Sequence, residues 1–353
     1  MELIIEPAPL RGTIEAVPSK SAAHRLLILA ALADAPTQIS PAQGSADTRR
    51  TLACLQALGA GFESRRGAVL VTPVDAPNPA PLLDCGESGS TLRFLLPVAA
   101  ALGMGGRFHG GGRLPERPLG DLVDAMRKQG VSFSREKLPL EITGRLKPGE
   151  FALPGSVSSQ YFTGLLLALP RLPGDSVIRI HGELESSAYV EMTLAALRRF
   201  GVNVFRSGDS FRIPGGQKYS SPGEVKVEGD WSSAAFFLAA GALGGPVTVT
   251  GLDAASLQGD RAIVPILKRF GAFVEISGER VTASGGKMRG GDIDFREIPD
   301  LLPVLAAVAA SAEGVSRFTG GARLRFKESD RIASTAALLR SLGGGAEELS
   351  DGL

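Results

Sequence analysis

The feature that most constrains the fold is a segment of roughly seventy residues that recurs along the 353-residue chain. In each copy, an apolar helix-like run closes on a small turn, as in LQALGA, MRKQGV, LRRFGV, LKRFGA and LRSLGG. The glycines of these turns are Gly59, Gly130, Gly201, Gly271 and Gly343, so the steps are 71, 71, 70 and 72 residues. A fixed period of this size indicates a fold assembled from copies of one supersecondary unit.

A second series runs in phase with the first. Its members are SKSAAHRLLILAALA, ESGSTLRFLLPVAAAL, SVSSQYFTGLLLALP, GDWSSAAFFLAAGAL and IPDLLPVLAAVAAS. SAAHRLLILAALA is apolar on nearly every side, which is typical of a buried helix. Each copy places small polar residues at the start of an apolar helix, where backbone N–H groups have no partner within the helix.

The remaining parts of the unit show other periods. AYVEMTLAALRRFG has apolar residues at helical spacing, and its glycine suits a left-handed helix end. VNVFRSGDSFRI and AFVEISGERVTA are expected to form hairpins around Ser-Gly turns. One unit is therefore strand, buried helix, strand, amphipathic helix and hairpin. This order predicts an α/β fold with sheets packed around a helical core. We expect three copies in a domain over residues 20–227, with residues 1–19 and 228–353 forming a second domain.

Composition narrows the class of protein. The 38 Lys and Arg nearly balance the 37 Asp and Glu, which argues against binding nucleic acid or an anionic membrane by bulk charge. Cys54 and Cys85 give neither a disulfide framework nor zinc spacing, as expected in a reducing cytosol, and three scattered histidines suggest no metal site. The N-terminal sequence lacks a secretory signal, and the longest apolar stretches are too short to span a bilayer. We expect a cytoplasmic protein.

The motif PSKSAAHR begins the first buried helix. Ser19 or Ser21 can cap this helix and leave its positive dipole end facing outwards. Lys20 and Ser21 add donors there, with Arg25 one helical turn later, so the site suits a phosphate or carboxylate. The alternative is an ordinary capped helix with surface cations.

The motif GESGSTLRF begins the equivalent helix of the second copy. Gly89 would let the backbone approach a ligand closely, while Ser88, Ser90 and Arg93 surround the helix start. The alternative is that these residues form a simple Gly/Ser turn without a ligand.

Two more motifs could complete such a pocket. In RLPERPLGDL, Pro118 suits the first turn of a helix, and Arg117 before it could bind an anion in bidentate fashion or be solvated. In GSVSSQYFTG, the side chains of Ser158, Ser159 and Gln160 could bind hydroxyl groups, or serve only as a helix cap.

The motifs REIPD and RLRFKESDRI carry an acid/base set. Asp300 begins a buried apolar helix, an expensive position for a carboxylate without a partner or a task. We expect Lys327 and Arg331 to share one helical face at i and i+4, with Glu328 beside them at the helix start. A surface ion pair is the alternative, but a buried carboxylate beside a lysine suits proton transfer.

Taken together and in this order, the motifs closely resemble the 5-enolpyruvylshikimate-3-phosphate synthase family. The resemblance runs through GTIEAVPSKSAAHR, GESGSTLR, ERPLG, SVSSQ, EGDWSSAAFFLAA, SLQGD, IPD and KESDR, essentially the whole chain. It implies transfer of the enolpyruvyl group of phosphoenolpyruvate to the 5-hydroxyl of shikimate 3-phosphate, without metal or cofactor. It implies that shikimate 3-phosphate is bound by Lys20, Ser21, Arg25, Ser158, Ser159, Gln160, Ser186, Asp300 and Lys327. Phosphoenolpyruvate is expected at Lys20, Gly89, Arg117, Gln160 and Arg331.

The resemblance also implies roles and an architecture. Asp300 resembles the proton acceptor, Lys327 and Glu328 the other proton-transfer groups, and Lys20 a further catalytic group. The family fold is an inside-out α/β barrel of six repeated units in two domains, with ligands between them and a monomeric state. Five units are recognised here. The family continues beyond Leu353 with a sixth unit carrying further phosphoenolpyruvate ligands, so the resemblance implies weak activity or none for this polypeptide.

Two other interpretations differ in function. A sister family transfers the same group to UDP-N-acetylglucosamine, but it typically carries a reactive cysteine in the loop that here is GGGRLPERPLG. An inactive or binding-only fragment is the second alternative, since a domain with two of its three units would expose apolar faces.

Overall fold

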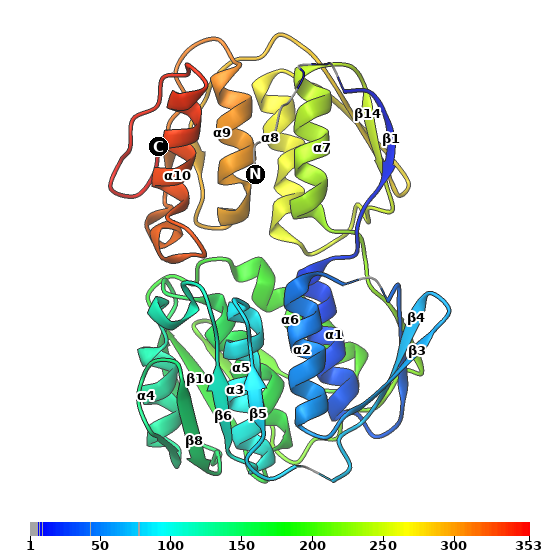
Figure 1. Cartoon of the computed structure of the whole chain (residues 1–353), viewed down its shortest axis with the longest axis vertical. Coiled ribbons are helices and arrows are strands. Elements are labelled where there is room, and N and C mark those ends of the chain that lie inside the picture. The colour runs from blue at the N-terminus through cyan, green and yellow to red at the C-terminus, as the bar shows by residue number, and fades with distance from the viewer. Residues whose placement is uncertain (1–5, 7, 9, 43, 77) are drawn as a thin grey trace. The chain divides into compact units, whose positions relative to one another are not determined.

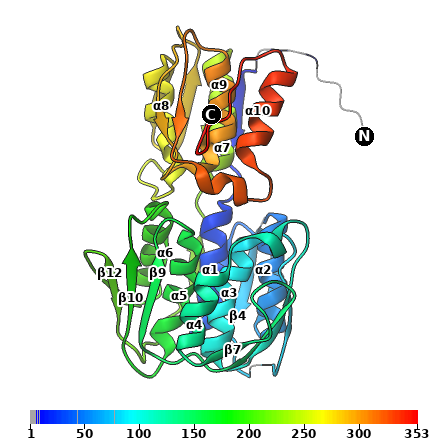
Figure 2. The ribbon, with the colours of Figure 1, turned by 90° about the vertical axis from the view of Figure 1, so that its left-hand side faces the viewer.

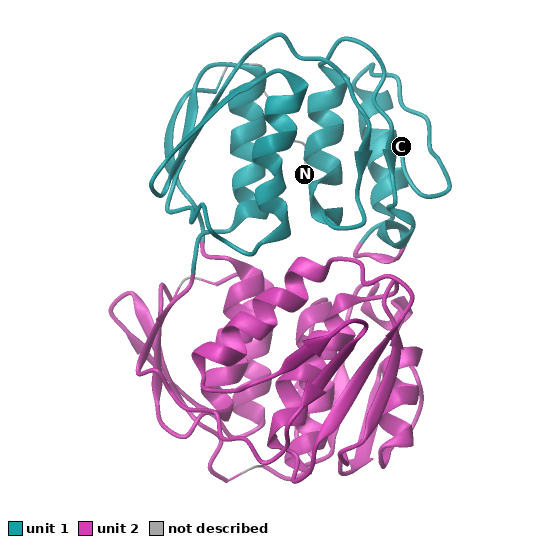
Figure 3. Ribbon diagram, turned by 180° about the vertical axis from the view of Figure 1, so that it is seen from behind, with its two compact units in different colours: residues 1–17, 228–325, 329–353 teal, residues 18–227, 326–328 magenta. Residues whose placement is uncertain are grey.

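The chain divides into two units, coloured separately in Figure 3. The computed structural model describes residues 6, 8, 10–42, 44–76 and 78–353. Unit 1 contains the described part of residues 1–17 together with Glu228–Arg325 and Ser329–Leu353, and unit 2 contains Pro18–Val227 and Phe326–Glu328. Residues 1–5, 7 and 9 of the predicted second domain lie outside the described part.

The secondary structure follows the repeat (Figure 1). The first copy contains β1 (Gly12–Glu15), α1 (Lys20–Leu32), β2 (Thr37–Ser40), α2 (Ala46–Ala57), β3 (Gly61–Arg65) and β4 (Ala68–Thr72). The second contains β5 (Leu82–Asp84), α3 (Gly89–Leu102), β6 (Gly106–His109), α4 (Gly120–Lys128), β7 (Val131–Phe133) and β8 (Leu140–Gly144). The third contains β9 (Glu150–Pro154), α5 (Ser159–Ala168), β10 (Ser176–His181), α6 (Ser187–Arg199), β11 (Phe205–Ser207) and β12 (Ser210–Ile213).

The fourth copy follows the same order, and the fifth shows its strand, helix, strand and helix without the hairpin among the described residues. The fourth contains β13 (Glu224–Lys226), α7 (Trp231–Leu243), β14 (Val247–Thr250), α8 (Ile263–Phe270), β15 (Phe273–Ser277) and β16 (Arg280–Ser284). The fifth contains β17 (Ile293–Asp294), α9 (Leu302–Ala310), β18 (Phe318–Thr319) and α10 (Arg331–Ser341). Short 3-10 turns lie at Leu114–Glu116 (η1), Leu169–Arg171 (η2), Gly259–Ala262 (η3), Pro299–Leu301 (η4) and Ala322–Phe326 (η5). The two predicted hairpins are β11–β12 and β15–β16, so both predictions are confirmed.

The sheets share one strand order. Copies two and three form the sheets β5-β6-β8-β7 and β9-β10-β12-β11, in which the first two strands are parallel and the hairpin is antiparallel. Copies one and four exchange their first strands: β1 pairs with β14, from Gly12 opposite Val247, and β13 pairs with β2, from Glu224 opposite Gln38. The chain therefore passes between the units after Val17 and again after Val227. The fifth copy pairs β17 with β18.

The repeated glycines have one conformational role. All five, which end the amphipathic helices, have positive φ angles between 75° and 107°. This left-handed backbone is strained for residues with a Cβ atom, and it ends each helix before the following strand. The predicted left-handed turn is confirmed at Gly59, Gly130, Gly201, Gly271 and Gly343.

The core of unit 2 is helical. Helix α3 packs against α5, and α1 packs against α2 and α6; Figures 1 and 2 show these helices on the inner side of the strands of unit 2. Gly164 lies on α5 against the carbonyl oxygen of Arg93 on α3, with which a Cβ at this position would overlap. The absence of a side chain at Gly164 therefore sets the spacing of the two helices.

A line of polar side chains also crosses this core. The Nδ1 atom of His24 lies 2.7 Å from the hydroxyl of Thr51, which lies 2.8 Å from that of Thr91, which in turn donates to Ser88 at 2.7 Å. The four side chains are buried and connect α1, α2 and the start of α3. Burial, followed by the charges of Lys20 and Arg25, lowers the pKa of His24 to about 3, so its imidazole is neutral at ordinary pH.

Unit 1 has its own core. Helix α7 packs against β14, β16 and α9, and α10 packs against α9. Trp231 at the start of α7 is fully buried, whereas Phe236 and Phe237 on the same helix are 54% and 39% exposed. Within the described ranges, no helix combines the length and the apolar character needed to cross a membrane.

We expect Gly164→Ala to destabilise unit 2, because the added methyl group meets backbone rather than a mobile side chain. Overpacking of this kind costs about 1–3 kcal/mol. The denaturant midpoint measures the loss. Gly120→Ala is the matched control, since a Cβ at Gly120 meets nothing within 4 Å. Equal midpoints for the two variants would show that the α3–α5 spacing tolerates the methyl group.

The buried neutral histidine predicts a loss of stability in acid. The unfolded chain binds a proton on His24 below the ordinary histidine pKa of 6.5, whereas the folded chain binds one only near pH 3. This difference lowers the free energy of unfolding as the pH falls through that window, by about 5 kcal/mol at most. We expect the wild type to lose stability relative to His24→Gln between these pH values. Parallel curves from urea unfolding at several pH values would contradict this.

Candidate functional site

Short polar side chains cap the three buried helices of unit 2. Ser19 accepts from the backbone N–H of Ala22, Ser88 from that of Thr91 at 3.1 Å, and Ser158 from that of Gln160. Of the two candidates for the first cap, Ser19 is therefore the cap and Ser21 lies inside the helix. The other first-turn N–H groups of each helix stay available to a ligand, and the dipole favours an anion there.

Two arginines lie over the start of α3. Arg93 is 3% exposed and Arg117 is 9% exposed. A Cβ built on Gly89 would lie 2.5 Å from Nη1 of Arg93 and 2.9 Å from Nη1 of Arg117. Both guanidinium groups therefore lie beside Gly89, and a side chain at this position would displace them.

Each of these arginines donates a hydrogen bond to a polar side chain. Arg93 donates to the side-chain oxygen of Gln160 at 3.0 Å, and Arg117 donates to Glu328 at 3.1 Å. The buried Nε atoms of both arginines have no hydrogen-bond partner among the described residues. Burial, followed by the charge of Arg117, lowers the pKa of Arg93 to about 10, so it stays protonated at neutral pH. Two cations with unused donors beside a helix start form a site for an anion.

Gln160 connects two of the helix starts. Its amide nitrogen donates to the hydroxyl of Ser90 at 3.0 Å, while its oxygen accepts from Arg93. The neighbouring Ser159 is 7% exposed at the start of α5. The structure thus brings the Ser158–Gln160 segment against Gly89 and its arginines, as one local group of donors.

The loop before α4 differs from its prediction. Pro118 was expected within the first helical turn, but α4 begins at Gly120 after Leu119, so this prediction is wrong. The extended backbone of Arg117, with ψ 144°, ends the η1 turn and separates it from α4. The carbonyl of Pro118 accepts from Nη2 of Arg93 at 2.7 Å, so the loop serves to position an arginine.

Arg25 lies deeper than its motif suggested. Its guanidinium, 3% exposed, donates to the hydroxyls of Thr163 and Thr193 and to the carbonyls of Ser21 and Tyr189. Arg25 therefore ties α1 to α5 and α6. Lys20 lies nearer the surface and pairs with Asp47 at 3.1 Å.

Ser186 occupies a strained backbone conformation. Its φ of 54° and ψ of 42° place it in the left-handed region, which is uncommon for residues other than glycine. It is 2% exposed at the start of α6, directly before a helix that Arg25 contacts. Such strain is concentrated at binding and active sites.

In unit 1, Asp300 lies in the η4 turn and pairs with Arg331. Nη1 of Arg331 donates to the carboxylate at 2.5 Å, and the two side chains are 30% and 23% exposed. Asp300 is therefore partly buried at the start of an apolar helix.

The predicted helical face of Lys327 and Arg331 is wrong. Asp330 caps α10 by accepting from the N–H of Ala333 at 3.0 Å, so the helix begins at Arg331. Lys327 and Glu328 lie before the helix, in the segment Phe326–Glu328 that groups with unit 2. An Asp at the cap position competes with helix formation upstream, and this preference outweighed the i, i+4 spacing.

Asp260 is a buried acid to which the sequence assigned no role. It lies in η3 within SLQGD, is 1% exposed, and accepts from the hydroxyl of Ser232 at 2.5 Å. Burial, followed by the charge of Asp300, raises its pKa to about 7. The sequence gives no sign of this electrostatic interaction, because Asp260 and Asp300 lie in different repeats. The SLQGD motif itself was the sole local signal.

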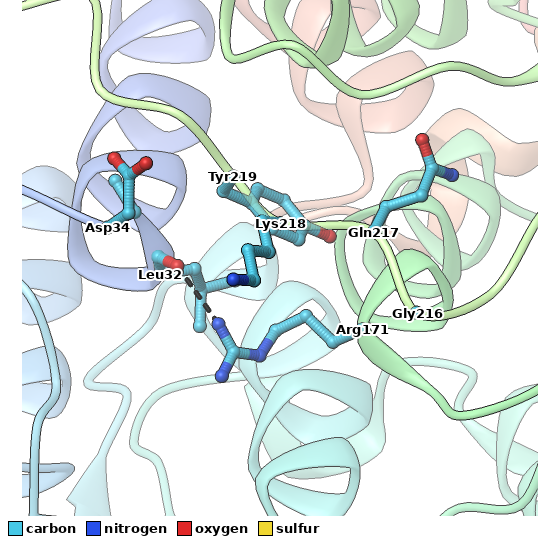
Figure 4. Close-up of a pocket in the computed structure, with 8 residues that line it drawn as sticks. Leu32, Asp34, Arg171, Gly216, Gln217, Lys218 and Tyr219 are labelled. Carbon is cyan, nitrogen blue, oxygen red and sulfur yellow. Dashed lines mark hydrogen bonds between the residues drawn. The ribbon is translucent and has the colours of Figure 1, made fainter.

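Figure 4 shows a pocket elsewhere in unit 2. Leu32, Asp34, Arg171 and Lys218 lie around it, and Arg171 donates to the carbonyl of Leu32 at 3.0 Å. These cations lie at the C-terminal end of α1, where basic side chains satisfy the last carbonyls. None of the predicted site residues lines this pocket, so we assign it a structural role.

Comparisons with known proteins identify the family of this chain. A family model described as EPSP synthase (3-phosphoshikimate 1-carboxyvinyltransferase) matches residues 4–353. The 3-phosphoshikimate 1-carboxyvinyltransferase of Clostridium kluyveri is 42% identical over 359 residues, covering 99% of this chain and 83% of that protein. The enzyme of the same name from Methanocorpusculum labreanum is 39% identical, covering 100% of this chain and 84% of that protein.

Solved structures confirm the predicted α/β fold class. An EPSP synthase from Acinetobacter baumannii matches with a TM-score of 0.77 at 26% identity, covering 97% of this chain and 80% of that one. The enolpyruvyl transferase NikO from Streptomyces tendae shares the fold, with a TM-score of 0.69 at 20% identity over 88% of this chain and 75% of that one. From its repeat, its motifs and these matches, the chain belongs to the EPSP synthase family.

Proposed function

We propose that this protein transfers the enolpyruvyl group of phosphoenolpyruvate to the 5-hydroxyl of shikimate 3-phosphate and releases phosphate. Family membership supports the reaction. The observation that carries the proposal is the buried pair of arginines over Gly89, whose unused donors and adjoining helix start suit a small polyanion. The cytoplasmic location and the monomeric state stay predictions.

We assign phosphoenolpyruvate to the group around the start of α3. Arg117 and the backbone at Gly89 would bind its phosphate or carboxylate, and Gln160, held by Arg93 and Ser90, would add a neutral donor. Lys20 and Arg331 complete the proposed set. Fixed cations also stabilise the charge that develops on the departing phosphate.

We assign shikimate 3-phosphate to the other helix starts. Ser158, Ser159 and Gln160 supply hydroxyl and amide groups at the start of α5. Ser21 and Lys20 supply donors at the start of α1, and Arg25 supports this turn through the carbonyl of Ser21. Ser186 and the unit 1 residues Asp300 and, from the adjoining segment, Lys327 complete the proposed set.

The proposed chemistry is an addition followed by an elimination. The 5-oxygen bonds to the central carbon of phosphoenolpyruvate as Asp300 accepts its proton, and the methylene carbon receives a proton from Lys327 or Glu328. The tetrahedral intermediate then loses phosphate, and the methyl group returns a proton as the new double bond forms. Asp300 suits the first step because the guanidinium of Arg331 stabilises its ionised form.

Asp300→Asn should abolish most turnover, because an amide cannot accept the proton. Loss of a general base typically costs about 100-fold or more. Phosphate release and mass spectrometry of the enol-ether product measure the effect, and calorimetry measures binding of shikimate 3-phosphate, which should largely remain. The control is Asp294→Asn, which alters another aspartate–arginine pair of unit 1. Unchanged turnover in Asp300→Asn would contradict the base assignment, and no product from the wild type would contradict the proposed reaction.

Arg117→Gln should weaken phosphoenolpyruvate far more than shikimate 3-phosphate. A lost charge-assisted hydrogen bond costs about 1.5–3 kcal/mol, which is about a 10- to 100-fold rise in Kd. Titration of each ligand separately measures the two effects. Arg127→Gln is the control, since Arg127 forms an exposed pair with Asp124 on α4. An equal loss of affinity for both ligands would place Arg117 outside the phosphoenolpyruvate site.

A further inference from the structure

We propose that Asp260 is a positioning residue that retains a proton beside Asp300, so that Asp300 carries the negative charge of the carboxyl pair. In this arrangement Asp300 is held ready to accept the proton of the substrate hydroxyl. The catalytic consequence rests on the proposed function. The shared proton itself is a property of the unliganded protein.

The environment of Asp260 favours its neutral form. The side chain is almost wholly buried, and the Ser232 hydroxyl is the donor to its Oδ2. The Oδ1 atom is buried without a hydrogen-bond partner among the described residues. An ionised carboxylate has about four lone-pair directions to satisfy, and leaving one oxygen unpaired away from water is costly.

The loop that carries Asp260 is fixed to the start of α7. The side chain of Gln258 accepts from the backbone N–H of Trp231 at 3.0 Å and donates to the carbonyl of Gly229 at 2.8 Å. Ser232 directly follows Trp231, so these two bonds hold the serine and Asp260 together. Turning the carboxyl group of Asp260 towards solvent would break its hydrogen bond from Ser232.

The charged neighbours of Asp260 act unequally. After burial, the charge of Asp300 is the largest cause that raises its pKa, and the charge of Asp230 acts in the same direction. The hydrogen bond from Ser232 and the charge of Arg331 oppose this rise. Arg331 donates directly to Asp300, which places the favourable cation on that carboxylate. Two carboxyl groups that repel each other share one proton, and this cation assigns the proton to Asp260.

The competing explanation is structural. Asp260 could be an ionised acceptor that serves only to hold Ser232 at the start of α7. That role requires no proton near neutral pH and no electrostatic link to Asp300. The two explanations therefore differ in the titration of the carboxyl groups rather than in the fold.

Carbon-13 NMR of the full chain with labelled aspartate carboxyl groups tests the proposal directly. We expect one buried carboxyl group to titrate near pH 7 in the wild type, and its signal to be missing in Asp260→Asn. The signal of Asp300 is identified by its absence in Asp300→Asn. In the wild type its chemical shift should change at the same pH, and in Asp260→Asn that change should be absent. Ionisation of Asp260 complete by about pH 5 would overturn the proposal.

A second variant keeps the test decisive if Asp260→Asn fails to fold. Ser232→Ala removes the hydrogen bond that lowers the pKa of Asp260, so its titration should move to higher pH. Asp292→Asn changes an exposed aspartate of unit 1 and should leave both signals unchanged. A shift to lower pH in Ser232→Ala would contradict the assigned proton.

The pH dependence of turnover tests whether the proton at Asp260 influences catalysis. We expect the pH profile of kcat to change near pH 7 in the wild type and to lose that change in Asp260→Asn, with a smaller effect on KM. The titrations need no substrate, so absent turnover would count against the proposed function alone. An unchanged pH profile in Asp260→Asn would show that the proton at Asp260 does not influence Asp300.

Discussion

The satisfaction of backbone N–H groups at the starts of buried helices is the constraint on which this structure depends. The first N–H groups of a helix have no partner within it, so a side chain caps the helix by accepting one of these hydrogen bonds. Ser19, Ser88, Ser158 and Asp230 do this in four copies of the repeat. Short polar residues therefore serve folding at the positive ends of the helix dipoles. The same residues that permit a helical core also prepare it to bind anions.

Much of the fold could be predicted from the chain because the repeat appears five times. Gly271, for example, is one of five glycines with the same positive φ, and the Ser-Gly turns at Ser207 and Ser277 give the expected hairpins. The exchange of β1 and β13 was not predicted. Strand pairing depends on surfaces formed by distant segments, and no local pattern in GTIE or EVK distinguishes one parallel partner from another.

The candidate site could be predicted where its chemistry coincides with a helix start. The residues around Gly89 lie together because each belongs to, or contacts, one of the repeated starts. Prediction was wrong where two local preferences competed, since the cap at Asp330 ends the upstream turn that would have carried Lys327. The sequence did not indicate a role for Asp260, because its pKa is raised by burial and by the charge of Asp300, which lies in another repeat. The depth of Arg25 likewise follows from three helices that meet around it.

The strand exchange has a consequence for the order in which the chain can fold during synthesis. Strand β1 leaves the ribosome well before its partner β14, which belongs to the fourth copy. Copies two and three complete their own sheets as they emerge, whereas β2 waits for β13, the first strand of the fourth copy. Domains usually fold from the N-terminus as they are made. Here β1 stays unpaired until the fourth copy has been translated, so its edge must be protected from other chains during that time.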